Sequence, residues 1–119
     1  MLTVYGIPNC DTVKKTLDWF KTHNIAYQFH DYRKEGISAD KLKEWLAQEP
    51  IDKIFNKNST TFKELSEEIK SSISDEKAAI NLMMNSNSII KRPIVEDGTI
   101  KAIGFKADQY KAIFMPDSK

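Results

Sequence analysis

Residues 2–30 read LTVYGIPNCDTVKKTLDWFKTHNIAYQFH, and this stretch decides the fold. It opens with a short apolar run that ends at a glycine, which predicts a buried strand. After a Pro-Asn turn, apolar side chains recur at helical spacing and predict a helix over about residues 10–23. Residues 26–30 then alternate between apolar and polar side chains, which is typical of a second strand. A strand, a helix and a strand within this span predict a βαβ unit with parallel strands.

The middle of the chain predicts three helices. Ser38 is expected to cap the first of them, and Pro50 to end it. Thr61 begins a capping-box pattern, so the second helix is expected to run to about Ser71. Ser74 is expected to cap the third helix. That helix carries the apolar residues Ala79, Ile80, Met83 and Met84.

The last third of the chain changes from helical to β-like patterns. Residues 94–95 and 100–103 are β-like, and the Asp97-Gly98 pair between them is a strong hairpin signal. Apolar residues at helical spacing after Gly104 predict a closing helix.

The order of these elements is that of thioredoxin with helices inserted in the middle. We therefore predict an α/β protein with a thioredoxin-like fold. Its four-stranded sheet should be mixed, parallel at the start and antiparallel at the closing hairpin. The length fits a single domain over residues 1–119, with a helical insertion over about residues 35–90.

Composition excludes several classes of function. With 18 basic and 17 acidic residues and a net charge of +1, the chain gives no electrostatic reason to expect nucleic acid or membrane binding. Its one cysteine cannot form an internal disulfide, whereas small secreted domains usually carry paired cysteines. No signal-peptide pattern occurs, and no run approaches the roughly 20 apolar residues of a membrane span. These features predict a cytoplasmic protein, and its balanced charge and small size predict a monomer.

Cys10 is the first candidate for chemistry. It lies where the predicted strand passes into the helix, so its sulfur meets unpaired amides and the positive end of the helix dipole, which favour a thiolate. Asn9, Thr12 and Lys14 are candidate supports, Thr12 through its hydroxyl and Lys14 through its charge, while Asp11 acts in the opposite direction. The alternative is that Cys10 is a small core residue, although its neighbours are polar.

The Arg92-Pro93 pair is the second candidate. A proline directly before a strand can hold a cis peptide bond, which turns the preceding backbone outward. In the thioredoxin order this loop faces the N-terminus of the first helix. Arg92 would then stand near Cys10, where it could bind an anion or stabilise the thiolate. The alternative is a solvated cation before a trans proline.

The two histidines are weaker candidates. His30 lies on a predicted strand, and His23 ends a predicted helix, where a positive charge suits the dipole. Together with Cys10 they match no zinc spacing, so no metal site is predicted.

Four segments in combination resemble the arsenate reductase-related superfamily, which includes the ArsC, Spx and YffB-like proteins. They are residues 5–15, 29–36, 55–57 and 90–94. The resemblance covers nearly the whole chain and is greatest to the YffB-like branch. It implies a thioredoxin-like domain with a helical insertion, a catalytic-type cysteine at Cys10 and an arginine before a cis-proline at Arg92-Pro93.

The resemblance also implies an activity, that of a glutathione-dependent thiol reductase. In the glutathione- and glutaredoxin-coupled arsenate reductases, the cysteine attacks the oxyanion and arginines bind it. This chain keeps Arg92 but has Asn56, and Phe105 or Lys106, where the family has its other two arginines. We therefore expect Cys10 to be the nucleophile and Arg92 to bind the anionic group. No cofactor would be bound, and glutathione would be the co-substrate, or a glutaredoxin the partner.

The Spx-type members supply the alternative, a non-catalytic, transcription-associated factor that binds RNA polymerase. Spx-type proteins sense oxidation through a Cys-x-x-Cys pair, and Val13 occupies the second of those positions here. A polymerase interaction that survives Cys10→Ser would favour this alternative.

Overall fold

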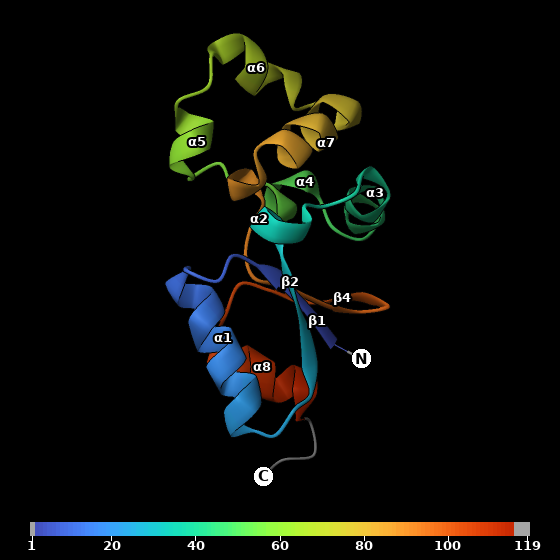
Figure 1. Ribbon diagram of the computed structural model, residues 1–119. Coiled ribbons are helices and arrows are strands. Elements are labelled where there is room, and N and C mark those ends of the chain that lie inside the picture. The colour runs from blue at the N-terminus through green and yellow to red at the C-terminus, as the bar shows by residue number, and fades with distance from the viewer. Residues whose placement is uncertain (1, 116–119) are drawn as a thin grey trace. The chain divides into compact units, whose positions relative to one another are not determined.

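The computed structural model describes residues 2–115, which form two compact units (Figure 1). Unit 1 comprises residues 2–31 and 92–115, and unit 2 comprises residues 32–91. In the described part of the chain, none of the helices combines the length and the apolar character that crossing a bilayer requires.

Unit 1 is built on a mixed four-stranded sheet with the strand order β2-β1-β3-β4. β1 pairs in parallel with β2 and antiparallel with β3, which pairs antiparallel with β4. The strands are β1 (Leu2–Gly6), β2 (Tyr27–Asp31), β3 (Ile94–Asp97) and β4 (Thr99–Ile103). The mixed sheet, the parallel βαβ unit and the closing hairpin that the sequence predicts are therefore confirmed.

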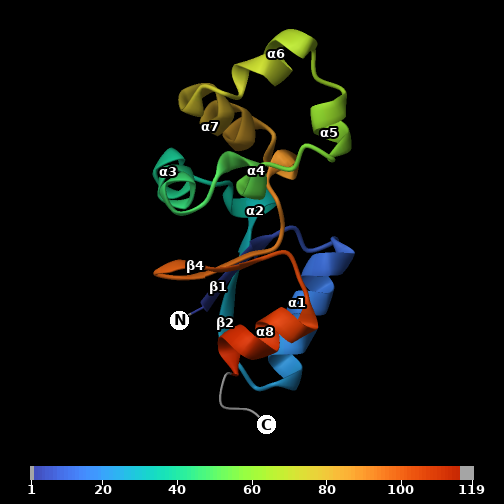
Figure 2. The same cartoon turned by 180° about the vertical axis from the view of Figure 1, so that it is seen from behind.

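Two helices, α1 (Asp11–Thr22) and α8 (Ala107–Phe114), lie side by side on one face of this sheet (Figures 1 and 2). Side chains alternate along a strand, so each strand sends every second residue toward the two helices. The core of unit 1 gathers around four buried residues: Val4, Phe20, Val95 and Tyr110. Burying apolar side chains of this size stabilises the fold by about 1.5–3 kcal/mol each.

Unit 2 consists of short helices. They are α2 (Tyr32–Glu35), α3 (Ala39–Gln48), α4 (Ile51–Ile54), α5 (Thr60–Lys63), α6 (Glu67–Ser72), α7 (Glu76–Asn85) and the 3-10 helix η1 (Asn87–Ile89). The helices α3 and α7 pack against each other. Ser38 caps α3 as predicted, because its hydroxyl accepts a hydrogen bond from the Lys41 amide at 3.1 Å.

The single helix predicted from Thr61 to about Ser71 is wrong, since this stretch forms the two separate helices α5 and α6. Ser59, not Thr61, caps α5, accepting a backbone hydrogen bond at 3.1 Å. A second serine, Ser66, accepts a similar bond at 3.2 Å and starts α6. Each serine offers an acceptor to the first amides of a helix. A new helix therefore begins at Ser66, where the sequence pattern predicted one continuous helix.

The predicted cap of α7 is wrong by one position. Asp75 is the N-cap, and its carboxylate accepts from the Lys77 amide at 3.3 Å, whereas the Ser74 hydroxyl donates back to the Ser71 carbonyl. Of the apolar residues on this helix, Ala79, Ile80 and Met83 are buried, whereas Met84 is 41% exposed.

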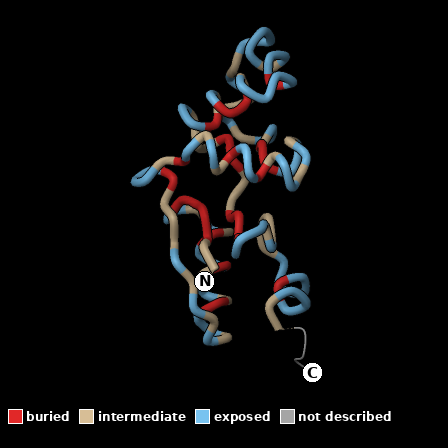
Figure 3. Tube along the Cα trace, turned by 90° about the vertical axis from the view of Figure 1, so that its right-hand side faces the viewer, coloured by how far each residue is buried: buried red, intermediate tan, exposed pale blue. Residues whose placement is uncertain are grey.

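The end of unit 2 is held by a short main-chain pairing. Residues 54–56 and 89–91 exchange backbone hydrogen bonds on either side of an isolated antiparallel bridge between Phe55 and Ile90. Both bridge residues are fully buried. In Figure 3, buried positions occur along the strands of unit 1 and on the helices of unit 2.

Candidate functional site

Cys10 is the N-cap of α1. The chain leaves β1 through a tight turn in which the Cys10 amide donates to the Ile7 carbonyl at 3.2 Å. The Cys10 carbonyl accepts the first bond of the helix from the Lys14 amide at 3.0 Å, while its own backbone is still extended. Its side chain is half-buried. The sulfur therefore stands at the helix end whose amides lack main-chain acceptors, as the sequence predicts.

The surroundings of Cys10 lower the pKa of its thiol below the ordinary value. The largest single influence, burial, raises this pKa, but four weaker ones together outweigh it. Hydrogen bonds from the Val13 amide, the Arg92 side chain and the Thr12 amide favour the thiolate, and so does the positive charge of Arg92. The Cys10 side chain forms no capping hydrogen bond of standard geometry with the helix, so the two amides act on the pKa as neighbours of the sulfur.

Arg92 belongs to the second segment of unit 1, far from Cys10 in the sequence. It precedes β3, and the Arg92–Pro93 peptide bond is cis, as predicted. Pro93 is buried, and its carbonyl accepts a hydrogen bond from the Gly104 amide at 2.8 Å. The loop that carries Arg92 is thus bonded to the residue that follows β4, and its side chain lies near enough to Cys10 to lower the pKa of the thiol.

The other three predicted site residues have smaller parts in this geometry. Asn9 is exposed in the turn before α1. Thr12 acts on the sulfur through its backbone amide, not through the hydroxyl that the sequence suggested. Lys14 is exposed, and the groups that shift the pKa of Cys10 do not include it.

Sequence reasoning missed a polar cluster behind the site. The Tyr110 hydroxyl, on α8, donates to the Gly104 carbonyl at 2.6 Å. Burial raises the pKa of Tyr110 to about 12, while the neighbouring Thr16 side chain acts to lower it. Thr16 is itself fully buried in α1 and donates to the Thr12 carbonyl at 2.8 Å. The one sequence signal for this cluster is a threonine on the apolar stripe of the predicted helix.

The two histidines lie apart from these contacts. The His30 ring packs on Tyr5 with 4.7 Å between ring centroids, on the strand pair β1–β2. The Nδ1 of His23 donates to the Trp19 carbonyl at 2.8 Å, and its ring stacks on that tryptophan. Both rings therefore have packing roles in the fold.

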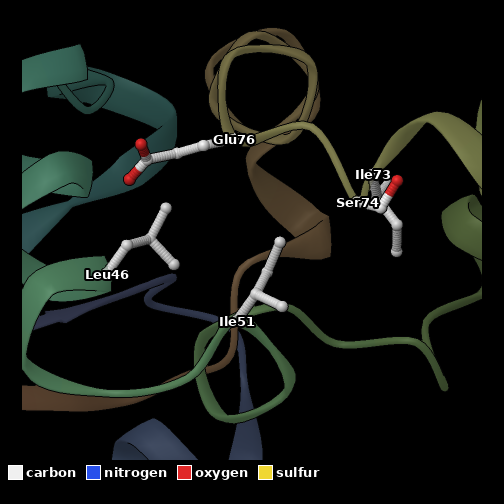
Figure 4. Close-up of a pocket in the computed structure, with 5 residues that line it drawn as sticks. All are labelled: Leu46, Ile51, Ile73, Ser74 and Glu76. Atoms are coloured by element: carbon white, nitrogen blue, oxygen red, sulfur yellow. The ribbon is translucent and has the colours of Figure 1, made fainter.

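Within the residues that the structure describes, neither a metal-binding cluster nor a pocket in unit 2 offers a second candidate site that contains a predicted site residue. Among residues 2–115, no group of three or more His, Cys, Asp or Glu side chains is arranged to hold a metal ion. Unit 2 contains a pocket of about 220 Å³ (Figure 4). It is lined by Leu46, Ile51, Ile73, Ser74 and Glu76. The candidate site is therefore the one around Cys10.

The fold and the site together define a thioredoxin-like protein with a half-buried cysteine at the start of its first helix and an arginine before a cis-proline. The model of the ArsC family matches residues 5–113. The chain belongs to the ArsC family, as the resemblance in its sequence predicts.

Individual relatives agree with this membership. An uncharacterised protein of Haemophilus influenzae is 42% identical over 114 residues, which are 96% of this chain and 99% of that protein. A global transcriptional regulator Spx of Streptococcus mutans is 29% identical, over 98% of this chain and 84% of the regulator.

Solved structures show the same fold. The structure of the protein YFFB matches with a TM-score of 0.88 and 41% identity, over 95% of this chain and 98% of that one. An arsenate reductase-related protein from Brucella melitensis matches with a TM-score of 0.74 and 43% identity, over 95% of this chain and 93% of that one.

Proposed function

We propose that this protein is a cytoplasmic, glutathione-dependent thiol reductase that uses Cys10 as its nucleophile. The observation that carries the proposal is the half-buried Cys10 sulfur at the N-terminus of α1, with the Arg92 guanidinium beside it. A thiolate is the reactive form of cysteine, and helix amides with a neighbouring arginine raise its population at neutral pH. Arg92 and the free amides of the helix would also hold an anionic substrate group.

The reaction would run as two thiol–disulfide exchanges. In the first, the Cys10 thiolate attacks a sulfur of a mixed disulfide between glutathione and a substrate thiol. A bond forms between Cys10 and the glutathione sulfur, the original S–S bond breaks, and the substrate leaves as a thiolate that takes a proton from water. In the second, a glutathione thiolate attacks the Cys10 adduct, so that glutathione disulfide leaves and the Cys10 thiolate is restored.

The resolving thiol must come from outside the chain. Cys10 is the single cysteine of the sequence, so no second protein thiol can attack the adduct. Overall, one glutathione thiol replaces the substrate thiol in the disulfide, so that the substrate sulfur is reduced to a thiol while the incoming glutathione sulfur is oxidised, and no metal or bound cofactor is required. A glutaredoxin could replace free glutathione in the second step.

A turnover assay tests this proposal. Wild type and Cys10→Ser are compared with a small glutathione mixed disulfide as substrate, and the formation of glutathione disulfide is followed. Mass spectrometry of the intact protein records the adduct. We expect turnover and an adduct only in wild type. No turnover and no adduct in wild type would refute the proposal.

A relocated cysteine provides the matched control. Ser38 is an exposed N-cap of α3, so the double variant Cys10→Ser/Ser38→Cys places the only thiol of the sequence at another helix start. The relocated thiol has the amides of a helix start beside it, as Cys10 does. It does not have the Arg92–Pro93 loop that belongs to the site around Cys10. If the relocated cysteine turns over as fast as Cys10, reactivity comes from any helix-capping thiol, and the assigned role of the site is wrong.

Arsenate is the second substrate to test, because arsenate reductases are among the similar proteins and the same thiolate could attack an oxyanion. This chain has Asn56, and Phe105 or Lys106, at the expected positions of two family arginines. Phe105 packs its ring on Tyr110, with 4.9 Å between centroids, and so supplies aromatic packing instead of a cation. We expect arsenate turnover to be much slower than disulfide turnover.

Relatedness to Spx favours one alternative, a transcription-associated protein that binds RNA polymerase. A redox switch of the Cys-x-x-Cys type would need a second cysteine at position 13. That position holds Val13, which is fully buried. A pull-down with RNA polymerase tests the alternative. Binding that persists in Cys10→Ser, without any thiol turnover in wild type, would favour this regulatory function over catalysis.

A further inference from the structure

The Tyr110 hydroxyl lies at the end of a short hydrogen-bond chain that leads to Arg92. It donates to the Gly104 carbonyl at 2.6 Å, and the Gly104 amide donates to the Pro93 carbonyl at 2.8 Å. Pro93 follows Arg92 through the cis peptide bond. Gly104 directly follows β4 and has a φ of +80°, so the strand ends just before the residue whose carbonyl Tyr110 binds.

The same hydroxyl lies beside the other half of the site. The Thr16 side chain lies close enough to Tyr110 to lower the pKa of its phenol, and the Thr16 hydroxyl donates to the Thr12 carbonyl at 2.8 Å. The Thr12 amide, in the same first turn of α1, faces the Cys10 sulfur. One phenol group on α8 is therefore linked to Pro93 through Gly104, and it lies next to Thr16, which bonds the first turn of α1.

We propose that Tyr110 is a positioning residue whose hydroxyl holds the Arg92–Pro93 loop and the first turn of α1 in the arrangement that lets Arg92 meet the Cys10 sulfur. This inference rests on the proposed function, because it concerns how the same thiolate is kept reactive. Tyr110 touches neither the sulfur nor a substrate, so its effect is transmitted through Gly104 and Pro93.

The hydroxyl, and not the ring, carries the positioning role. The Tyr110 ring packs among the rings of Trp19, Phe20, Phe105 and Phe114, with centroid distances between 4.9 and 5.7 Å. Phenylalanine at this position keeps that packing and removes only the oxygen. Tyr110→Phe therefore separates the two contributions.

The test measures the reactivity of Cys10 toward iodoacetamide across a range of pH. In Tyr110→Phe we expect the midpoint of the pH–rate profile to move upward. If the midpoint rises by one pH unit, the thiolate fraction at any pH well below the midpoint falls about tenfold. Because a more basic thiolate is also a better nucleophile, the alkylation rate at neutral pH should fall by only about threefold.

Two further variants complete the design. Tyr27→Phe removes the hydroxyl of a half-buried tyrosine whose ring also packs on Phe20, so we expect its pH–rate profile to match wild type. Thr16→Val keeps the shape of Thr16 but removes the hydroxyl beside Tyr110, and it should shift the profile in the same direction as Tyr110→Phe. If Tyr110→Phe shows no cooperative thermal transition, it is not folded, and the profile of Thr16→Val then tests the positioning role.

The outcomes separate this inference from the proposed function. A folded Tyr110→Phe, or in its absence a Thr16→Val, with an unshifted profile would overturn the positioning role, even if wild type turns over glutathione. A shifted profile supports it, even if wild type shows no glutathione turnover, because alkylation reads the thiol directly. A loss of thermal stability without a shifted profile would show a purely structural hydroxyl and would also overturn it.

Discussion

A β-carbon on Gly6 would lie 2.7 Å from Cγ2 of Val13, closer than real side chains approach one another. Gly6 is the last residue of β1, and Val13 is fully buried in the first turn of α1. The missing side chain therefore lets the helix start directly against the strand. Because the Val13 amide stabilises the Cys10 thiolate, this close approach also fixes one wall of the candidate site.

Gly6→Ala should consequently disturb both the fold and the thiol. Val13 is β-branched and has little rotamer freedom in a helix, so backbone must move to relieve the contact. We expect a loss of about 1–3 kcal/mol in the free energy of unfolding, measured by urea denaturation, as for other overpacked positions. Val13→Ala removes the opposing methyl groups, so the double variant should lose less than the two single losses added together. Additive losses would show that the two residues do not clash.

Replacing Arg92 should raise the pKa of Cys10. Arg92→Met removes both the hydrogen bond and the charge, whereas Arg92→Lys keeps the charge without the planar guanidinium. We therefore expect the pKa to rise most in Arg92→Met and less in Arg92→Lys, as measured by the ultraviolet absorbance of the thiolate against pH. Lys21→Met, which removes an exposed charge from the last turn of α1, is the control and should leave the pKa unchanged. An unchanged pKa in Arg92→Met would remove this residue from the site.

The sequence predicted those parts of the fold that short-range patterns determine. The βαβ unit follows from periodicity within residues 2–31, and the hairpin follows from Asp97-Gly98, whose glycine has a φ of +77°. The caps of α5 and α7 could not be predicted as well. Ser59 and Thr61 compete for one helix start, and Ser74 and Asp75 for another, and a local pattern does not rank two good capping residues.

For the candidate site, too, the sequence predicted only what local patterns determine. Cys10 and the Arg92-Pro93 pair stand out locally, as a cysteine before a helix and an arginine before a strand proline. The contact between Gly6 and Val13 and the bond between Tyr110 and Gly104 depend on how the helices pack on the sheet, which a single sequence does not reveal. Lys14 shows the converse, because its nearness in sequence suggested an influence on Cys10 that the structure does not contain.

The lowered pKa of Cys10 makes the stability of the protein depend on pH. The unfolded chain holds the thiol proton up to a pH of about 8.5, whereas the folded protein releases it at lower pH. The unfolded state therefore binds more protons between these two pKa values, and stability rises with pH across that window. The contribution is complete above the unfolded pKa and is lost as the pH falls through the folded pKa.

Cys10→Ser should lack this dependence. We expect the difference in free energy of unfolding between wild type and Cys10→Ser to grow in favour of wild type as the pH rises toward about 8.5, and then to level off. Urea denaturation at a series of pH values under reducing conditions measures it. A difference that is constant over the series would mean that the folded and unfolded thiols have the same pKa, in conflict with a stabilised thiolate.

A buried hydrogen bond on the other face of the sheet should affect stability but not the thiol. The Tyr5 hydroxyl donates to a Glu96 carboxylate oxygen at 2.9 Å, and the two residues are only 7% and 8% exposed. Tyr5→Phe removes this donor from a buried carboxylate, so we expect a loss of about 1–3 kcal/mol in the free energy of unfolding. Tyr27→Phe, at a half-buried tyrosine, should lose less. Because Tyr5 is absent from the groups that shift the pKa of Cys10, the alkylation profile of Tyr5→Phe should match wild type, and a shifted profile would show that the site depends on both faces of the sheet.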